Sequence, residues 1–360
     1  MNFFSRFFLL LGILVSFNAE AVTSIMIQKA RQPSAQNVFL PPHSPAKEMK
    51  IALIGAPKVI GKYAQSTYNV ALATLLAKHP ENYTLTRFDI PDESEASLAQ
   101  VISTIHQQGF NAILAPLTVN GVQRLSHLEN SIDTFIPTVH KRDVPGAPEN
   151  FVFGAIDYMK QIEALLPYMG NGISIFYDNS AVGTQLKQIT EELFLESDRA
   201  KKSVAAYPVD AQGDNIIAHL SKPSAFAKKS VILHIPVVKS AILTAHMTFT
   251  GIKERNILST QINIDPTLIS LTQYNDRKNM ILANSIVEHA ARIDDANAMM
   301  NNDIAFDWIQ YATSVGTDYL VAKLENSERD YSMRIVGSQV IYPVQLLKAK
   351  EFGFEPITAK

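Results

Sequence analysis

The stretch ISIFYDNSAVGTQLKQITEEL, residues 173–193, decides the fold class of this chain. It opens with the apolar run Ile173–Tyr177, which predicts a short buried strand. A polar Asp-Asn-Ser loop follows, in which Asn179 or Ser180 is a preferred residue type for capping the helix predicted over Thr184–Leu195. A buried strand, a tight polar loop and an amphipathic helix together form half of a unit with parallel strands.

The same alternation of strand and helix continues on both sides of this stretch. Helices of this length between strands imply right-handed crossovers and parallel sheets that are covered on both faces. The rhythm restarts at Phe151, which indicates two such α/β units in tandem, each with its own sheet. The other predicted strands are Ile51–Ile54, Tyr83–Phe88, Ala112–Ala115, Phe151–Phe153, Val231–Ile235 and Asn256–Ser259, and the other predicted helices are Tyr63–Lys78, Leu98–Gln108, Tyr158–Met169 and Ala241–Phe249.

The pattern changes after Asp265. We expect two further strands, one long helix and a single tail hairpin, at Leu268–Tyr274, Met280–Ile286, Phe306–Leu324, and Arg334–Ile341 with Gln345–Phe352. Each lobe is then discontinuous in sequence. The expected division is a first lobe of residues 50–153 and 277–325, and a second lobe of residues 154–276 and 326–360.

The composition excludes several classes of protein. The chain has 360 residues and a formal net charge of −2, whereas a nucleic-acid binder needs a basic surface, so we expect no nucleic-acid partner. It has no cysteine, which excludes disulfides, thiolate metal sites and a lipidated cysteine, so the protein is not expected to be a lipoprotein. The length allows about two domains with an ample core.

The N-terminus has the three parts of a secretory signal peptide. Met1–Arg6 carries a positive charge, Phe7–Phe17 is apolar, and Ala19-Glu20-Ala21 places small residues before a cleavage site. The apolar run is shorter than the about 20 residues of a membrane-spanning helix. We therefore expect cleavage of residues 1–21, a flexible proline-containing leader over residues 22–49, and a periplasmic location.

These elements carry a resemblance to a known family. Residues 173–193, the strand end Phe135–Thr138 and the segment Val231–Met247 resemble parts of type I periplasmic binding proteins of the leucine/isoleucine/valine-binding family. The resemblance extends over about Lys50–Ile357. Shorter matches lie at Ala112–Pro116, at Phe151–Phe153 with Asp157 and Gln161, and at Asp318-Tyr319.

The resemblance implies a fold and two functions. The fold is two α/β lobes, each a mostly parallel sheet with helices on both faces, which are joined by hinge strands and close on a ligand. The first function is non-enzymatic capture of a small-molecule solute in the inter-lobe cleft, for an ABC-type transporter of the inner membrane. Gly337, the tail hairpin and Phe352-Gly353 are also similar to the penicillin-binding-protein activator family. That similarity implies an alternative, an envelope protein that binds and regulates a partner protein. Neither resemblance implies a cofactor or a metal.

The loops that follow the strands are the expected site. In open parallel sheets the ligand crevice lies beyond the carboxyl ends of the strands. The predicted ligand-binding residues are Pro116, Leu117, Thr118, Thr138 and His140 in the first lobe, and Tyr177, Asn179, Pro236, Val237 and Gln261 in the second.

Several of these residues have a second interpretation. Thr118 and Thr138 suit a ligand carboxylate, but threonine after a strand is also common turn chemistry. His140, with the two basic residues after it, suits an anionic ligand or a solvated loop. Tyr177 suits stacking on a ligand, whereas Asn179 is also a helix cap.

One family feature is missing. Amino-acid binders of this family usually meet the ligand's ammonium group with an acidic side chain from the second lobe. Here the loop after Ser259 reads Thr260-Gln261-Ile262-Asn263, and the nearest acid is Asp265. The loop Pro236–Val238 is apolar. This departure favours a different solute or a protein partner.

The sequence contains no complete copy of the common enzyme motifs. Gly55–Tyr63 resembles a phosphate-binding loop, but five residues separate its glycines and a tyrosine follows Lys62, where Mg²⁺ binding needs serine or threonine. GxGxxG, GxSxG and HExxH do not occur, and the nine histidines are dispersed, which argues against an enzyme and a zinc site. His234, inside an apolar strand, is expected to be a core residue.

Overall fold

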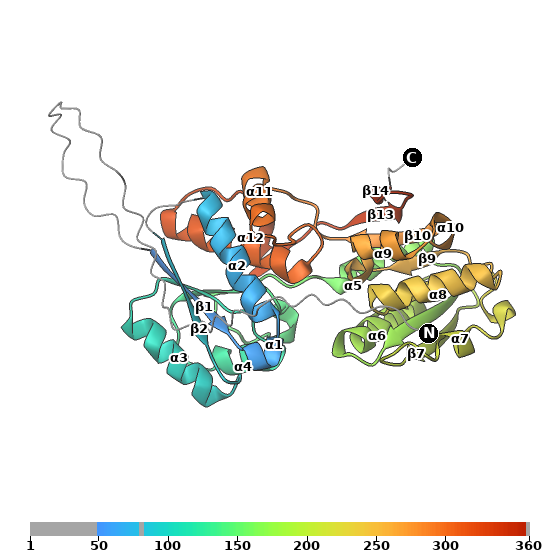
Figure 1. Ribbon diagram of the computed structural model, residues 1–360. Helices are drawn as coiled ribbons and strands as arrows, with labels where there is room; N and C mark the ends of the chain where they lie inside the picture. Colours follow the sequence, from blue (N-terminus) through green and yellow to red (C-terminus); the bar gives the residue numbers. More distant parts are fainter. Residues whose placement is uncertain (1–48, 79–82, 358–360) are drawn as a thin grey trace, which may run out of the picture. The chain divides into compact units, whose positions relative to one another are not determined.

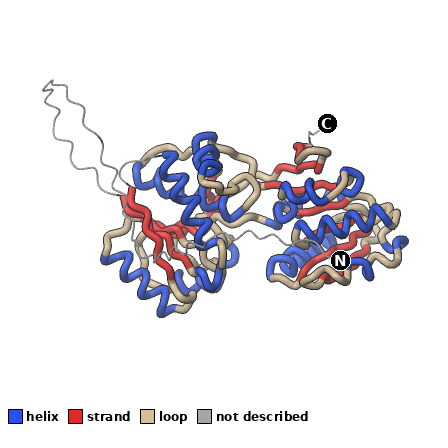
Figure 2. Tube along the Cα trace, in the orientation of Figure 1, coloured by secondary structure: helices blue, strands red, loops and turns tan. Residues whose placement is uncertain are grey.

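Residues 49–78 and 83–357 are described by the computed structural model, which arranges them as two mixed sheets of seven strands with helices around them (Figures 1 and 2). The expected fold class is therefore confirmed. The expected signal peptide, and all of the expected leader except Met49, lie outside the described residues. Met49 already belongs to the first strand.

The first sheet is parallel apart from one edge strand. β11 pairs antiparallel with β12, and every other neighbouring pair is parallel. Its order is β11 (Arg334–Val336), β12 (Gln339–Ile341), β5 (Phe151–Phe153), β4 (Asp133–Ile136), β3 (Ala112–Leu114), β1 (Met49–Gly55) and β2 (Tyr83–Asp89).

The second sheet repeats this plan with an antiparallel hairpin at its edge. β13 is antiparallel to both of its neighbours, and the remaining pairs are parallel. Its order is β14 (Phe354–Pro356), β13 (Gln345–Ala349), β10 (Met280–Asn284), β9 (Ile257–Ser259), β8 (Ser230–His234), β6 (Gly172–Asp178) and β7 (Ser203–Val209).

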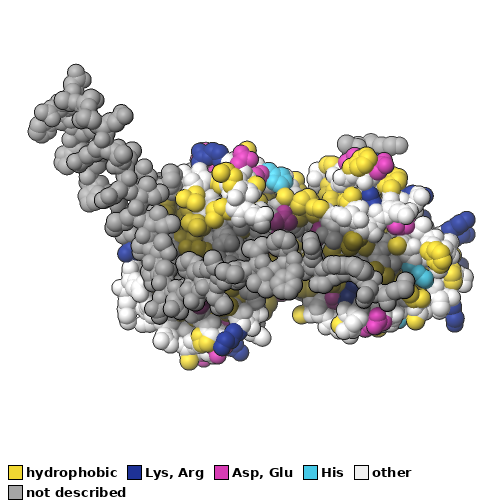
Figure 3. Space-filling view, in the orientation of Figure 1, with side chains coloured by type: hydrophobic (Ala, Val, Ile, Leu, Met, Phe, Trp, Pro, Cys, Tyr) yellow, Lys and Arg dark blue, Asp and Glu magenta, His cyan; other side chains and the backbone are white. Residues whose placement is uncertain are grey.

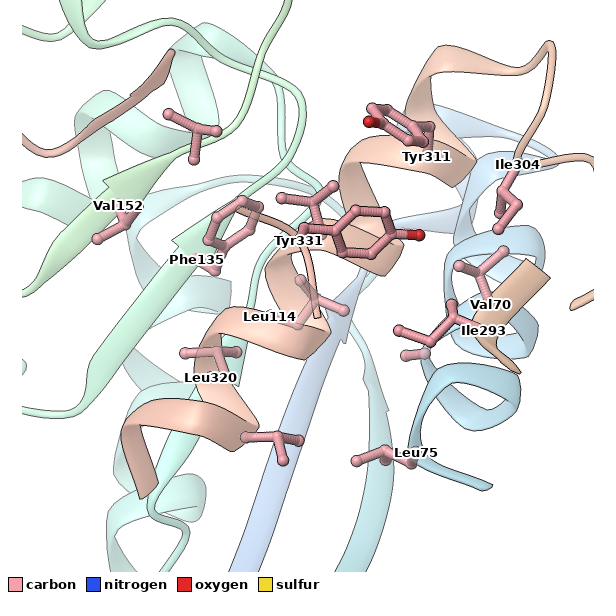
Figure 4. Packing of buried hydrophobic residues seen from close by; sticks show 14 of the residues in the cluster. Val70, Leu75, Leu114, Phe135, Val152, Ile293, Ile304, Tyr311, Leu320 and Tyr331 are labelled. Atoms are coloured by element: carbon pink, nitrogen blue, oxygen red, sulfur yellow. The ribbon is translucent and has the colours of Figure 1, made fainter. Parts of the chain in front are cut away.

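Both faces of the first sheet are covered, because alternate residues of its strands point to opposite sides. Ile51 and Leu53 pack on one face, and Ala52 and Ile54 on the other. Figure 4 shows the first cluster, where Leu114, Phe135 and Val152 of the strands meet Leu320, Tyr331 and Val70. The helices of that face are α2 (Tyr63–Lys78), α11 (Ala291–Met299) and α12 (Trp308–Glu325), and those of the other face are α3 (Glu95–Gln107) and α4 (Val119–Ser126).

The second sheet is covered in the same way. α5 (Tyr158–Leu165) and α6 (Ala181–Glu196) pack on one face, and α7 (Ile216–His219), α8 (Val237–Phe249) and α9 (Pro266–Leu271) on the other. The short elements are α1 (Pro57–Ile60), α10 (Tyr274–Arg277), and the 3₁₀ turns η1 (Lys141–Asp143), η2 (Leu166–Tyr168), η3 (Pro223–Ala225) and η4 (Gln261–Asn263).

The late part of the chain differs from the sequence expectation. The expected strand Leu268–Tyr274 is not formed, and residues 268–271 belong to helix α9. That helix starts because Pro266 occupies the first helical position and the Asp265 side chain accepts from the Thr267 amide at 2.7 Å. The tail forms two hairpins instead of one. β11–β12 joins the first sheet and β13–β14 the second, with Pro343 in the passage between them.

Strand membership also differs from the expected lobe boundaries. β10 was expected in the first lobe, but it pairs with β9 and β13 in the second sheet. β11 and β12 were expected in the second lobe but extend the first sheet beyond β5. The passages between lobes therefore follow β5, β10 and β12. The reason is pairing: β10 is buried along its whole length and hydrogen-bonds on both edges.

A buried ion pair fastens α12 to α2. Lys78 at the end of α2 donates to Asp318, whose side chain is fully buried, and to Asp330. Burial by itself lowers the pKa of Lys78, but the hydrogen bonds to Asp318 and Asp330 outweigh it and raise that pKa. Asp318 also accepts from the amides of Asp330 and Tyr331, each at 3.1 Å. The carboxylate thus holds the chain that leads from α12 to β11.

Close approach of α12 to the sheet requires a glycine. A Cβ atom on Gly316 would lie 2.1 Å from Cδ1 of Phe135. We expect Gly316→Ala to lower the unfolding temperature, although alanine ordinarily favours a helix by about 1 kcal/mol over glycine. Thermal unfolding of the single and double variants measures this. Adding Phe135→Ala is expected to remove most of the alanine penalty, so additive effects of the two substitutions would contradict this account.

Candidate functional site

The predicted site residues lie at the carboxyl edges of the two sheets. In the first lobe, residues 116–118 follow β3 and residues 138–140 follow β4. In the second lobe, Tyr177 lies at the end of β6, and the other predicted residues follow β6, β8 and β9. The parallel topology therefore gathers each lobe's predicted residues at one edge, where a crevice is expected. Their role in binding stays a prediction.

Thr118 is hydrogen-bonded to Glu93, a partner that the sequence did not predict. Its amide donates to Glu93 Oε1 at 2.9 Å, its hydroxyl donates to the other carboxylate oxygen, and the same hydroxyl caps α4 by accepting from Gly121 at 3.3 Å. Glu93 is only 5% exposed. The turn interpretation of Thr118 is therefore realised, and no local motif around Glu93 signals this pairing.

The neighbouring loops of the first lobe are tied together. Pro116 and Leu117 are buried, and the Thr138 hydroxyl donates to the Leu117 carbonyl. Both threonine hydroxyls that were predicted to bind a ligand carboxylate thus have partners inside the protein. A ligand would have to displace these bonds or rely on other groups.

Asp157 pairs with two side chains of the basic loop at His140. Arg142 donates to Asp157 Oδ1 at 2.5 Å, and His140 Nε2 lies 3.7 Å from the second carboxylate oxygen. His140 Nδ1 accepts from the Arg142 amide at 3.2 Å, which caps η1. Burial raises the pKa of Asp157, but hydrogen bonds from His140 and Arg142 outweigh it and hold that pKa well below its usual range. This contact joins the loop after β4 to the first passage between lobes.

In the loop after β6, Ser180 and not Asn179 caps the following helix. Ser180 caps α6 by accepting from the Gly183 amide at 3.0 Å, whereas Asn179 makes no such bond and is exposed. Tyr177 is half-buried, with Lys187 Nζ 5.9 Å from its ring centroid. Pro236 is exposed at the start of α8, and Val237 is half-buried.

Gln261 lies in a buried network of amide and hydroxyl groups. The backbone amide of Gln261 donates to Gln161 Oε1 at 2.9 Å, and its side-chain Oε1 accepts from the backbone amide of Ser285 at 2.7 Å. Gln161 Nε2 donates to Ser285 Oγ at 2.9 Å, which joins α5, η4 and the end of β10. Within the described chain, Gln261 Nε2 is buried without a hydrogen-bond partner. The hydroxyl of the preceding residue, Thr260, is likewise buried without a partner there, so this edge of the second lobe has two unpartnered donors among the described residues.

Two aspartates, one of them far away in sequence, act on the pKa of Asp303. Burial raises the pKa of Asp303, and the charges of Asp307 and Asp265 raise it further. Asp307 caps α12 by accepting from the Gln310 amide at 3.1 Å, and its charge raises the pKa of Tyr63, which burial also raises. Asp265 is the nearest acid after β9 in the sequence. No local pattern connects it with Asp303 and Asp307, which come from the segment before α12.

No group of three or more metal-ligating side chains is found among residues 49–78 and 83–357. In the same part of the chain, no helix is long and apolar enough to cross a membrane. A groove of about 660 Å³ lies apart from the predicted residues, beside α9 and the β13–β14 hairpin. Its apolar lining includes Ile264, Ile269, Phe306, Leu347 and Phe354.

Comparison with solved structures shows what this fold resembles. The branched-chain amino acid transporter substrate-binding protein of Streptococcus pneumoniae, solved with isoleucine, is 12% identical, with a TM-score of 0.61 over 86% of this chain and 98% of that chain. A branched-chain amino acid ABC transporter protein of Thermus thermophilus with bound valine is 14% identical, with a TM-score of 0.61 over 86% and 95%.

A leucine-, isoleucine-, valine-, threonine- and alanine-binding protein of Brucella ovis, in a closed conformation, is 13% identical, with a TM-score of 0.63 over 87% and 95%. No family model matches the chain, and no curated protein matches it. These likenesses establish the type I periplasmic binding protein fold, and the expected resemblance to it is confirmed.

His234 gives the second lobe a pH dependence. It is buried, with Nε2 2.8 Å from the Thr190 hydroxyl, and burial lowers the pKa of its imidazole to about 3. Between the ordinary value of about 6.5 and about 3, the unfolded chain binds a proton that the folded chain does not. Stability from this group is therefore present above pH 6.5 and falls as the pH decreases.

We expect the unfolding free energy to lose about 2 kcal/mol through His234 between pH 7 and pH 5. Urea unfolding at both pH values measures the loss, and His234→Leu is expected to reduce it by that amount. His106→Gln, at an exposed position in α3, is the matched control and should keep the wild-type loss. An unchanged pH dependence in His234→Leu would refute the assignment.

Proposed function

We propose that this protein is a periplasmic solute-binding protein that captures a small molecule between the carboxyl edges of its two lobes and delivers it to an ABC-type transporter. The observation that carries the proposal is the fold itself: two sheets with the same order of five parallel strands, each with its predicted binding loops at one edge. The proteins of similar fold are substrate-binding proteins and receptors, which supports a binding function without catalysis. The expected signal peptide supports export.

The charges at the site favour a ligand with an ammonium group. Burial is the largest cause that raises the pKa of Asp303, and the charges of Asp307 in the same lobe and of Asp265 in the second lobe raise that pKa further. A cationic group placed among them would relieve their mutual repulsion. Gln261 Nε2 offers a hydrogen-bond donor at the same edge of the second lobe, suited to an acceptor oxygen. An amino acid or a related amine carries groups of both kinds.

A thermal-shift screen of the refolded protein tests the proposal. Unfolding and refolding first remove carried-over ligand, and the panel contains amino acids, short peptides, organic acids, aromatic acids, nucleosides and cell-wall fragments. A specific ligand at about 100 times its dissociation constant stabilises the fold by roughly 2.7 kcal/mol. A shift with one ligand class supports the proposal. A flat panel with verified refolding would overturn it.

The variant Asp307→Asn removes a negative charge from this site and keeps a side chain that can cap α12. Asparagine caps helices about as well as aspartate, so we expect the unfolding temperature without ligand to stay close to that of the wild type. Affinity for an amine ligand found in the screen is expected to fall about tenfold or more, because a hydrogen-bonded charge partner is lost. Isothermal titration calorimetry measures the affinity. Asp92→Asn, at an exposed acid elsewhere in the first lobe, is the control and should leave the affinity unchanged.

A second function is favoured by the engaged hydroxyls of the first lobe. Thr118 and Thr138 both bind groups of the protein itself, and Pro116 and Leu117 beside them are buried. An envelope protein that grips and regulates a partner protein needs no open polar edge. A flat ligand panel, followed by specific recovery of one envelope protein, would support this alternative.

A further inference from the structure

The amino edge of the second sheet carries a concentration of basic side chains. The segments that lead into its strands and out of its helices lie there, at the end of the lobe opposite the binding loops. Segments 196–202, 228–229, 253–256 and 278 hold eight basic side chains against three acidic ones, although the whole chain has a net charge of −2. The basic residues are Arg199, Lys201, Lys202, Lys228, Lys229, Lys253, Arg255 and Lys278.

Hydrogen bonds place these segments side by side. The Lys228 amide donates to the Lys253 carbonyl at 3.1 Å, and the Arg255 amide donates to the Lys229 carbonyl at 2.8 Å. The segments precede β10, β9, β8 and β7 in a sheet of order β10-β9-β8-β6-β7, so the row spans about 19 Å at roughly 4.8 Å per strand. Gly170 and Gly172 leave room for the aliphatic stems of Arg255 and Lys229, which a Cβ atom there would approach to 3.0 Å.

Within the described chain, the basic side chains of this row have no carboxylate partner, although those of Arg199, Lys202 and Lys278 donate to the Leu166 carbonyl, the Leu195 carbonyl and Asn275 Oδ1. Among residues 49–78 and 83–357, none of the eight basic side chains forms an ion pair, whereas Lys187 and Lys323 elsewhere do. Lys350, on the β13–β14 turn of the same edge, pairs with Glu355 at 3.6 Å. Lys201 and Lys228 adopt positive φ angles of 55° and 63°, a conformation that favours glycine. The acidic side chains on this edge are Glu196, Asp198, Glu254, Asp276, which lies beside Lys253 and Lys278, and Glu351 on the β13–β14 turn.

Exposed hydrophobic side chains lie at the same edge. The helices run antiparallel to the strands, so α8 ends there with Phe249, which is 86% exposed. The turn between β13 and β14 presents Phe352, which is 90% exposed, and α6 ends near Leu195. In Figure 3, basic side chains project at the right-hand end of the view with hydrophobic atoms beside them. The residues directly before β4 and β5 of the first sheet, 128–132 and 144–150, hold Glu129 and Glu149 and no lysine or arginine.

We infer that the amino edge of the second lobe is an attachment surface for a membrane that contains anionic lipids. Lysine and arginine near such a surface bind its headgroups, and isolated aromatic side chains enter the boundary of the hydrocarbon region. A fluid interface accepts separate phenylalanines without a matching pocket, which a folded acidic partner would have to supply. This surface uses none of the binding-loop residues, so the inference stands apart from the proposed solute-binding function.

Vesicle sedimentation tests the inference. The predicted mature chain, residues 22–360, is mixed with vesicles of phosphatidylcholine alone or with about 30% phosphatidylglycerol, at low and at about 0.5 M salt. We expect binding only to the anionic vesicles, and loss of binding at high salt. The variant Lys228→Ser/Lys229→Ser/Lys253→Ser/Arg255→Ser is expected to bind at least about tenfold more weakly.

Two control variants keep the test specific. Lys58→Ser/Lys62→Ser/Lys160→Ser/Arg334→Ser removes the same charge from other exposed positions and should bind like the wild type. Phe249→Ser/Phe352→Ser should weaken binding severalfold, whereas Met299→Ser, at an 88% exposed position of the first lobe, should not. Circular dichroism confirms that each variant folds. Equal binding to neutral vesicles, equal loss in both charge variants, or no binding by the wild type would each overturn the inference, the last in favour of an acidic protein partner.

Discussion

Both sheets depend on three passages of the chain between the lobes, which follow β5, β10 and β12. Because of these passages, neither lobe is made from one continuous piece of sequence. The first sheet is complete only when β12 lies beside β5, and the second only when β13 lies beside β10. The long-range pairing is secured in the first lobe by the buried contact of Lys78 with Asp318, since it holds the returning helix α12 against α2. A buried charge without its partner is costly, so this contact admits one arrangement of the two helices.

The topology also explains the position of the binding loops. Parallel pairing brings the carboxyl ends of the strands to one edge, and the loops that follow them have to satisfy their own polar groups there. Thr118, Thr138 and His140 do so within the first lobe, by bonds to Glu93, to the Leu117 carbonyl and to the Arg142 amide. At the second lobe, Gln261 keeps one buried donor without a partner in the described chain. The polar groups that could bind a ligand at the carboxyl edges therefore lie mainly in the second lobe and in the aspartates before α12.

The two ends of the second lobe have different chemistry for a related reason. At its carboxyl edge, the loop after β9 is held in a buried hydrogen-bond network with Gln161 and Ser285. Its amino edge consists of short connections, and helix ends and turns are exposed there. Lysine and arginine stems extend across Gly170 and Gly172, and their charges remain in solvent. Phe249 and Phe352 stay exposed because no element of the described chain covers the end of α8 or the β13–β14 turn.

The sequence by itself determined the fold class, because local patterns report it. The apolar run Ile173–Tyr177 and the capped helix after it appear as β6 and α6, and the strands at Ile51 and Val231 appear as β1 and β8. The pattern did not predict α4 and β7, since α4 has eight residues and β7 is a half-exposed edge strand that contains Pro208. Only the tertiary structure decided which sheet β10 and β11–β12 join, because strand pairing depends on contacts far apart in sequence. The same holds for Glu93 with Thr118, for Asp157 with Arg142 and for Asp265 with Asp303, whose partners no local spacing records.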